Sequence, residues 1–280
     1  MNTLSTQDIL LSARSLPALP AIVMELIQCM DDPHVNMEQL ALKISHDQAL
    51  TSKTLRLANS SFYGLSRQVT SIAEATPILG MRTLRSIAIA AGLVDKLQRQ
   101  TDSNFDMASF WRHSIGTALC ARALAQAASL DEDVAFTLGL LHDIGRLVLA
   151  TRHSEHYAAA MAYRRAQDCS SQQAEQFVWA PDHTQVGKVV AEHWNFAPTI
   201  VDAIANHHNP VPQPKRSLAD ALHVADNIIH ALDLSHYRED MVPPLSMAAW
   251  SRLALDESAY ARVFRETEAQ YESMCQILLT

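Results

Sequence analysis

The segment FTLGLLHDIGRLVL, residues 136–149, decides the fold of this chain, because it places two titratable side chains inside a long apolar helix pattern. The pattern predicts one helix, capped by Asp131 or Asp133 and running to about Ala150. Apolar residues occupy nearly every position around this predicted helix. A helix that is apolar all round is usually buried. We therefore expect this segment in the core of the protein.

The composition extends this prediction to the whole chain. The 280 residues, of which 48% are hydrophobic and 19% charged, are typical of a globular protein with one large domain or two coupled ones. Only 7 glycines occur, although glycine usually makes up about 7% of residues. A β-rich fold depends on glycine in its turns, and the frequent Ala, Leu and Gln favour helix. The composition therefore predicts an all-α protein.

The charge and the apolar runs exclude several classes of partner. The net charge is −8, whereas nucleic-acid binders usually show a basic field or stripe. No apolar run approaches the roughly 20 residues of a membrane span, and no signal peptide is evident. The cysteines are far apart, as expected of reduced thiols. We therefore expect a cytoplasmic protein that binds neither nucleic acid nor membrane. The cysteines are Cys29, Cys120, Cys169 and Cys275.

Polar and proline-containing stretches divide the chain. The most polar stretch of the first half, QRQTDSNFD at 98–106, predicts a boundary between an N-terminal helical lobe, residues 1–100, and a second lobe, residues 101–240. Pro243 and Pro244 then precede C-terminal helices, which we expect to pack on the core as a third segment, residues 241–280. Apolar periodicity predicts helices at about 22–30, 36–46, 47–59, 81–97, 108–129, 154–167, 170–178, 183–193, 198–207, 217–232, 246–254 and 257–278.

His142 and Asp143 are the first candidates for a functional site. Burying two such side chains is costly unless they are hydrogen-bonded, paired or bound to a metal. Imidazole and carboxylate are good ligands for a divalent transition metal. Adjacent helix residues point about 100° apart, so they converge only on an ion close to the helix. The alternative is a hydrogen-bonded core histidine beside a salt-bridged aspartate, and the pair alone leaves it open.

Other histidines and an aspartate supply further candidates. His113 lies on the long predicted helix 108–129, and Asp226 lies at the edge of an apolar stripe. His183 opens a predicted helix, while His207 and His208 end another. Each has a simpler explanation when taken alone. These include a solvated position, an N-terminal cap and, for the histidine pair, a favourable interaction with the helix dipole.

Taken together, these residues occur in sequence segments that match a known pattern. The segments FWRHSIGTALCARALA (110–125), FTLGLLHDIGRLVL and LHVADNIIHAL (222–232) present His113, His142-Asp143 and Asp226 in order. This order resembles the HD superfamily of metal-dependent phosphohydrolases. The first half is similar to one branch, the HDOD (HD-related output domain) family, and the resemblance covers roughly residues 14–235. It is carried by LPALPAIVMELIQ (16–28), ISHDQALTSKTLRLANSSFYG (44–64) and SIAEATPILGMRTLRSIAIA (71–90).

The resemblance implies an all-helical fold in which the N-terminal lobe packs on an HD-like lobe. It also implies a role in bacterial signalling, in a family for which enzymatic activity has generally not been established. It further implies a cofactor of one or two divalent ions, such as Fe, Mn, Mg or Zn. The first set of ligands that it implies is His113, His142, Asp143 and Asp226. His183, His207 and His208 resemble the added ligands of HD-GYP phosphodiesterases.

Two departures weigh against cyclic-dinucleotide hydrolysis without removing the metal. The stretch after the paired histidines, NHHNPVPQPKR at 206–216, lacks the Gly-Tyr-Pro element of HD-GYP enzymes. The residue after HDIG, often lysine, is Arg146. Arginine keeps the positive charge but presents a planar fork.

Two functions follow from the resemblance. The first is a signalling module that acts by binding a signalling protein or a small phosphorylated ligand, with the NSSFYG loop (59–64) and the helix 81–97 as partner surfaces. The alternative is a metal-dependent phosphohydrolase acting on a nucleotide or cyclic-nucleotide phosphoester. In that case Asp143 bridges two ions, and Arg146 or Lys188 steadies the phosphate.

Overall fold

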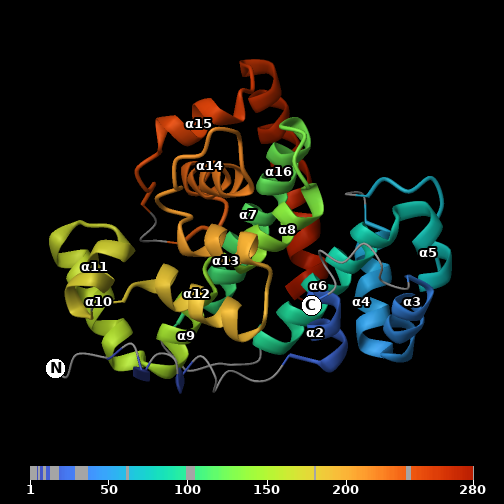
Figure 1. The fold of residues 1–280 in the computed structure, drawn as a ribbon, viewed down its shortest axis with the longest axis horizontal. Coiled ribbons are helices and arrows are strands. Elements are labelled where there is room, and N and C mark those ends of the chain that lie inside the picture. The colour runs from blue at the N-terminus through green and yellow to red at the C-terminus, as the bar shows by residue number, and fades with distance from the viewer. Residues whose placement is uncertain are drawn as a thin grey trace.

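All the regular structure in the described part of the chain is helical, so the predicted all-α fold is confirmed. Figure 1 shows helices α2–α6 on one side of the molecule, α7–α14 on the other, and the long α16 between them. The computed structural model describes residues 5, 7–8, 11–12, 19–28, 37–60, 63–98, 105–179, 181–237 and 241–279.

The N-terminal group of helices surrounds α6, which contacts every other member of the group. The side chains of Asp47 and Ser71 cap α4 and α5 by accepting hydrogen bonds from backbone N–H groups of the first turns. α6 is buried along most of its length, so it offers little of the partner surface expected at 81–97. The bounds are α2 Ala21–Gln28, α3 Met37–His46, α4 Gln48–Ala58, α5 Ile72–Leu79 and α6 Met81–Gln98.

The loop at 59–64, the other expected partner surface, is described only in part. Phe62 lies outside the described residues. The ring of Tyr63 lies 5.1 Å from the Arg122 guanidinium, which belongs to the second group of helices. Tyr63 therefore packs between the two groups of helices.

The second group is built around α7, which packs against α8 and α14. At Gly139 of α8 an added Cβ would lie 2.5 Å from the Ala118 backbone, so only glycine allows α8 to approach α7 this closely. The bounds are α7 Met107–Ala127, α8 Glu132–Leu141, α9 Ile144–Arg152, α10 Ser154–Gln167, α11 Ser171–Val178, α12 His183–His193, α13 Pro198–Ala205 and α14 Leu218–Ala231.

The single helix predicted from Asp131 to Ala150 is wrong at its centre. α8 ends at Leu141, His142 and Asp143 form a turn, and α9 begins at Ile144. Both helices are buried on every side, so the apolar pattern runs through them without a break. The pattern therefore does not show where the chain changes direction. The turn aims two adjacent side chains at one point, which a straight helix would hold about 100° apart.

The C-terminal helices contact both groups of helices. α15 (Met247–Leu253) contacts α14, and α16 (Glu257–Leu279) contacts α7, α6 and α4. α16 therefore joins the two groups of helices. Residues 99–104, most of the predicted boundary, lie outside the described residues, so the division of the chain into three segments stays a prediction.

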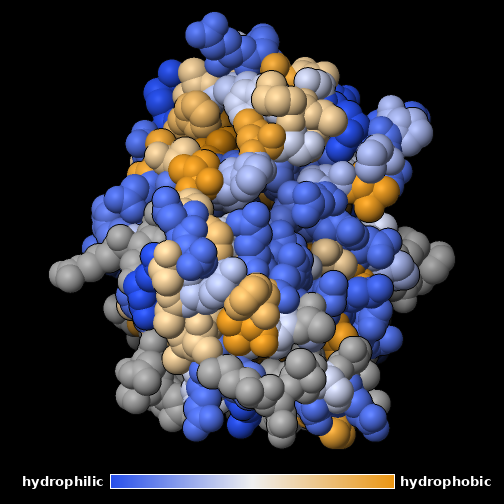
Figure 2. Space-filling model, turned by 90° about the vertical axis from the view of Figure 1, so that its left-hand side faces the viewer, coloured by the Kyte–Doolittle hydropathy of each residue, from blue (hydrophilic) through white to orange (hydrophobic). Residues whose placement is uncertain are grey.

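One segment, Glu132–Arg152, is long and apolar enough to cross a membrane, with a mean hydropathy of 1.4 over its most apolar window. However, 89% of that window is buried inside the protein, and the turn at His142 divides it. Apolar atoms on the face shown in Figure 2 form separate patches among hydrophilic ones. The segment is therefore part of the core, as its all-round apolar pattern predicted.

Candidate metal centre

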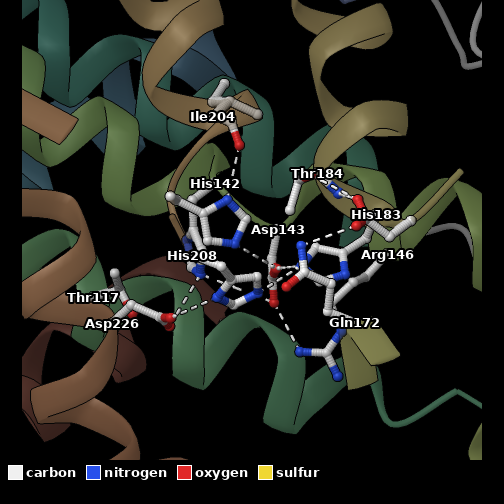
Figure 3. Close-up of polar contacts among 12 residues, drawn as sticks. Thr117, His142, Asp143, Arg146, Gln172, His183, Thr184, Ile204, His208 and Asp226 are labelled. Atoms are coloured by element: carbon white, nitrogen blue, oxygen red, sulfur yellow. Dashed lines mark hydrogen bonds and ion pairs between the residues drawn. The ribbon is translucent and has the colours of Figure 1, made fainter. Parts of the chain in front are cut away.

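The structure brings all seven predicted site residues together from separate helices. His113 lies in the first third of α7, His142 and Asp143 form the α8–α9 turn, and His183 is the first residue of α12. His207 and His208 follow the end of α13, and Asp226 lies on α14. Six of the side chains are buried, and His208 is 19% exposed. Figure 3 shows the imidazoles of His142, His183 and His208 clustered around the carboxylates of Asp143 and Asp226.

The first half of the cluster surrounds Asp226. Its Oδ1 lies 3.1 Å from Nε2 of His113 and 3.5 Å from Nε2 of His142. The two imidazole nitrogens are themselves 3.2 Å apart. Three ligand-type atoms from three different helical elements therefore meet within one small volume.

The second half surrounds Asp143. Its Oδ1 lies 3.4 Å from Nε2 of His183 and 3.8 Å from Nε2 of His207. Nε2 of His208 lies 3.0 Å from that of His183. Asp143 Oδ2 faces His142 at 3.9 Å, so this carboxylate lies between the two halves.

Two glycines allow the halves to approach. A Cβ added to Gly145, in the first turn of α9, would lie 2.0 Å from the His183 carbonyl oxygen and 2.6 Å from the Gly187 backbone nitrogen. Backbone therefore packs directly on backbone where α9 meets α12. This contact holds the His142–Asp143 turn next to His183.

Hydrogen bonds to the outer ring nitrogens orient three of the imidazoles. His142 Nδ1 lies 2.8 Å from the Gly139 carbonyl oxygen, and His207 Nδ1 lies 2.8 Å from the Ile204 carbonyl oxygen. A carbonyl oxygen only accepts, so each Nδ1 carries a hydrogen, and Nε2 is the ring nitrogen left to bind a metal. His183 Nδ1 is held in the same way by Glu175. All three Nε2 atoms therefore face the cluster.

The sequence interpretation missed Glu175 and His230. Glu175, on α11, is fully buried, and its Oε2 accepts from the His183 ring at 2.6 Å and from the His183 backbone N–H at 2.8 Å. His230, on α14, places Nε2 3.4 Å from Asp226 Oδ1. A spacing of four from Asp226 on one helix face was the available signal for His230. The only signal for Glu175 was an acid in a glutamine-rich helix.

Burial and neighbouring charges shift the pKa values of the ionisable groups in the cluster. Burial opposes ionisation of Asp143, but Arg146, whose Nη1 lies 2.7 Å from Oδ2, and then His142 hold the pKa of this carboxyl well below its usual range. Burial likewise opposes protonation of His183, yet Glu175 raises the pKa of this imidazole to about 9. Burial, followed by repulsion from His142, lowers the pKa of His207 to about 3. The aspartates are therefore ionised and His207 is neutral at neutral pH.

The cluster has the donors that a divalent ion requires. Within the described part of the chain, some buried polar atoms of the cluster have no hydrogen-bond partner, namely His113 Nδ1, His207 Nε2, His208 Nδ1 and Asp226 Oδ2. Such buried atoms are costly without a partner. Metal–nitrogen bonds of about 2.1 Å place neighbouring ligand atoms about 3.0–3.4 Å apart, close to several of the separations above. Three groups of donors lie close enough together to hold an ion: His183, His207 and His208; His113, Asp226 and His230; and His113, His142 and Asp143.

A pocket of about 1000 Å³ opens onto the cluster. Asp143, His183 and Asp226 line it together with Arg146, Tyr157 and the polar residues of α11. Lys188, the other predicted phosphate contact, does not line this pocket and pairs with Glu192 on the surface of α12. The pocket therefore offers the guanidinium of Arg146, which pairs with Asp143, beside the clustered donors.

Comparison with solved structures places the fold among bacterial HDOD proteins. An HDOD domain protein of unknown function from Geobacter sulfurreducens superposes with a TM-score of 0.79 at 23% identity, covering 98% of each chain. A protein from Shewanella amazonensis SB2B, named provisionally as a phosphohydrolase, superposes with a TM-score of 0.78 at 27% identity. That match covers 96% of this chain and 97% of the other.

A curated relative shows the same similarity in sequence. An uncharacterised protein of Treponema pallidum (strain Nichols) is 25% identical over 222 residues. The match covers 78% of this chain but only 43% of the relative, so this chain spans less than half the length of that relative. A family model described as the HDOD domain matches residues 16–210. The chain belongs to the HDOD family.

Proposed function

We propose that this protein is an HDOD signalling module whose divalent metal centre binds and hydrolyses a small phosphoester. The observation that carries the proposal is the buried histidine–aspartate cluster at the floor of a pocket of about 1000 Å³. A scaffold requires neither a pocket of this size nor unpaired donors aimed into its core. The likeness to a provisionally named phosphohydrolase at 27% identity supports the same reading.

The ligands would hold two ions, with Asp143 as a ligand to both. Imidazole-rich donor sets favour Fe or Zn, and the carboxylates also accommodate Mn. A divalent ion bound there polarises the phosphoryl group and lowers the pKa of a bound water. The first ion would be held by His113, His142, Asp143 and Asp226, and the second by Asp143, His183, His207 and His208.

The chain's own residues provide orientation and charge. Arg146 lines the pocket with its side chain 17% exposed, and it presents the planar fork that matches phosphate oxygens. Its ion pair with Asp143 fixes the guanidinium next to the donors. Arg146 therefore orients the phosphate, and Asp143 couples that position to the metal ligands.

A second candidate function is binding without turnover, in which a phosphorylated ligand or a signalling protein reads the state of the site. The ion pair between Arg146 and Asp143 favours this second candidate. Arg146 Nη1 lies 2.7 Å from Asp143 Oδ2, an oxygen that a bridging ion would also need. Neither candidate assigns the protein a nucleic-acid or membrane partner.

The test is hydrolysis of a panel of phosphomonoesters and phosphodiesters by protein loaded with Mn²⁺ or Fe²⁺. Turnover that disappears in Asp143→Ala and persists in His193→Ala, an exposed histidine on α12, supports the hydrolase. Binding of a phosphoester without turnover, lost in Arg146→Ala, supports the second candidate. Turnover that survives Asp143→Ala contradicts the proposal.

A further inference from the structure

His230 lies one helical turn after Asp226 on α14, and its side chain is 14% exposed. We propose that His230 is a further protein ligand to the ion held by His113, His142 and Asp226. The inference rests on the proposed metal centre but does not depend on hydrolysis. It gives this chain a metal-binding residue that the HD pattern of the sequence did not supply.

The geometry around one carboxylate oxygen carries the proposal. Asp226 Oδ1 has three imidazole nitrogens beside it, from His113 at 3.1 Å, His142 at 3.5 Å and His230 at 3.4 Å. The rings of His113 and His230 lie side by side with centroids 4.4 Å apart. His230 is therefore as close to the shared oxygen as the ligand that the motif predicts, His142.

Hydrogen bonding leaves the Asp226 carboxylate incompletely satisfied, because its buried Oδ2 has no hydrogen-bond partner among the described residues. His142 Nδ1 donates to the Gly139 carbonyl oxygen, and this bond holds His142 Nε2 3.5 Å from Asp226 Oδ1. A divalent cation among these buried nitrogen and oxygen atoms offsets the cost of burying them together. A cation at this point is also within reach of His113 and His230, which approach the same oxygen.

The extra imidazole changes the nature of the first ion. Sites filled by protein ligands are structural, whereas catalytic sites keep a position for water or substrate. With His230 added to His113, His142, Asp226 and the shared Asp143, the first ion is enclosed by protein. It then joins α7, the α8–α9 turn and α14, and the open position for a phosphoester belongs to the second ion.

A cysteine substitution tests coordination without measuring activity. His230→Cys loaded with Co²⁺ is expected to show thiolate-to-Co²⁺ charge-transfer absorption, because a thiolate at this position replaces the imidazole. His193→Cys is the matched control at an exposed position, and it is expected to show none. Absence of the band in His230→Cys that still binds Co²⁺ overturns the proposal.

Removal of the ring gives a second readout. His230→Ala is expected to weaken binding of one ion roughly 10- to 100-fold in a chelator competition, and added imidazole is expected to restore it through the open pocket. Unchanged affinity in folded His230→Ala, with or without loss of hydrolysis, overturns the proposal. If the wild type hydrolyses no phosphoester but His230→Cys shows the Co²⁺ charge-transfer band, the proposed hydrolase is contradicted and His230 remains a ligand.

Discussion

At the residue scale, Glu175 shows how the protein supports the metal centre from outside it. It holds His183 through the ring and the backbone, from a helix that contributes no metal ligand of its own. Outer carboxylates of this kind orient the imidazole and increase its basicity. Glu175→Gln is therefore expected to lower metal affinity roughly 10- to 100-fold, as measured by competition with a chromogenic chelator.

The matched control is Glu192→Gln, on the exposed face of α12, where the glutamate pairs only loosely with Lys188 at 3.9 Å. Its metal affinity should equal that of the wild type. Equal affinities for the two variants would mean that Glu175 only fills space beside His183.

At the element scale, the contact between α9 and α12 decides where the two halves of the cluster meet. Gly145→Ala places a methyl group 2.0 Å from the His183 carbonyl oxygen, so backbone must move. Overpacking of this kind typically costs about 1–3 kcal/mol. We expect Gly145→Ala to lower the free energy of unfolding in urea by that amount and to reduce metal content. Gly187→Ala should cost less, because its nearest contact is a side-chain methyl group of Ile204 at 3.0 Å and not backbone. Equally small losses of unfolding free energy in both variants would contradict the expected clash between α9 and α12 at Gly145.

Most of the helical elements were predictable from sequence because they have an apolar stripe and, in many cases, a side-chain cap at the N-terminus. His183, for example, opens α12 as predicted, directly after the Asp182 cap. The break at His142 was not predictable, since a buried helix and two buried helices in line share one apolar pattern. His230 was hidden because a polar residue at the edge of α14 resembles a solvated position until α7 is seen to pack beside it. Glu175 was hidden because its partner His183 lies beyond the end of its helix.

At the scale of the whole molecule, α16 connects the two groups of helices. Its Tyr271 is buried, donates to the Leu234 carbonyl oxygen at 2.7 Å and lies against the Arg112 guanidinium. We expect Tyr271→Phe to lower the free energy of unfolding by about 0.5–1.5 kcal/mol, the net value of a hydrogen bond. Tyr271→Ala should cost about 3–5 kcal/mol.

Urea denaturation at fixed metal concentration measures both. Phe177→Ala, at a position that is 68% exposed, is the control and should change stability by less than about 1 kcal/mol. A Tyr271→Ala loss no larger than that of the control would mean that Tyr271 does not stabilise the packing of α16 on the second group of helices.

The central claim is that the cluster around Asp143 and Asp226 is a metal centre. The most direct measurement is metal analysis of the protein purified without added metal, beside His142→Ala and the exposed control His193→Ala. We predict about one to two equivalents of a transition metal in the wild type and in His193→Ala, with a large loss in His142→Ala. Less than about 0.2 equivalents in all three proteins, also after incubation with Fe²⁺, Mn²⁺ or Zn²⁺, would contradict the claim.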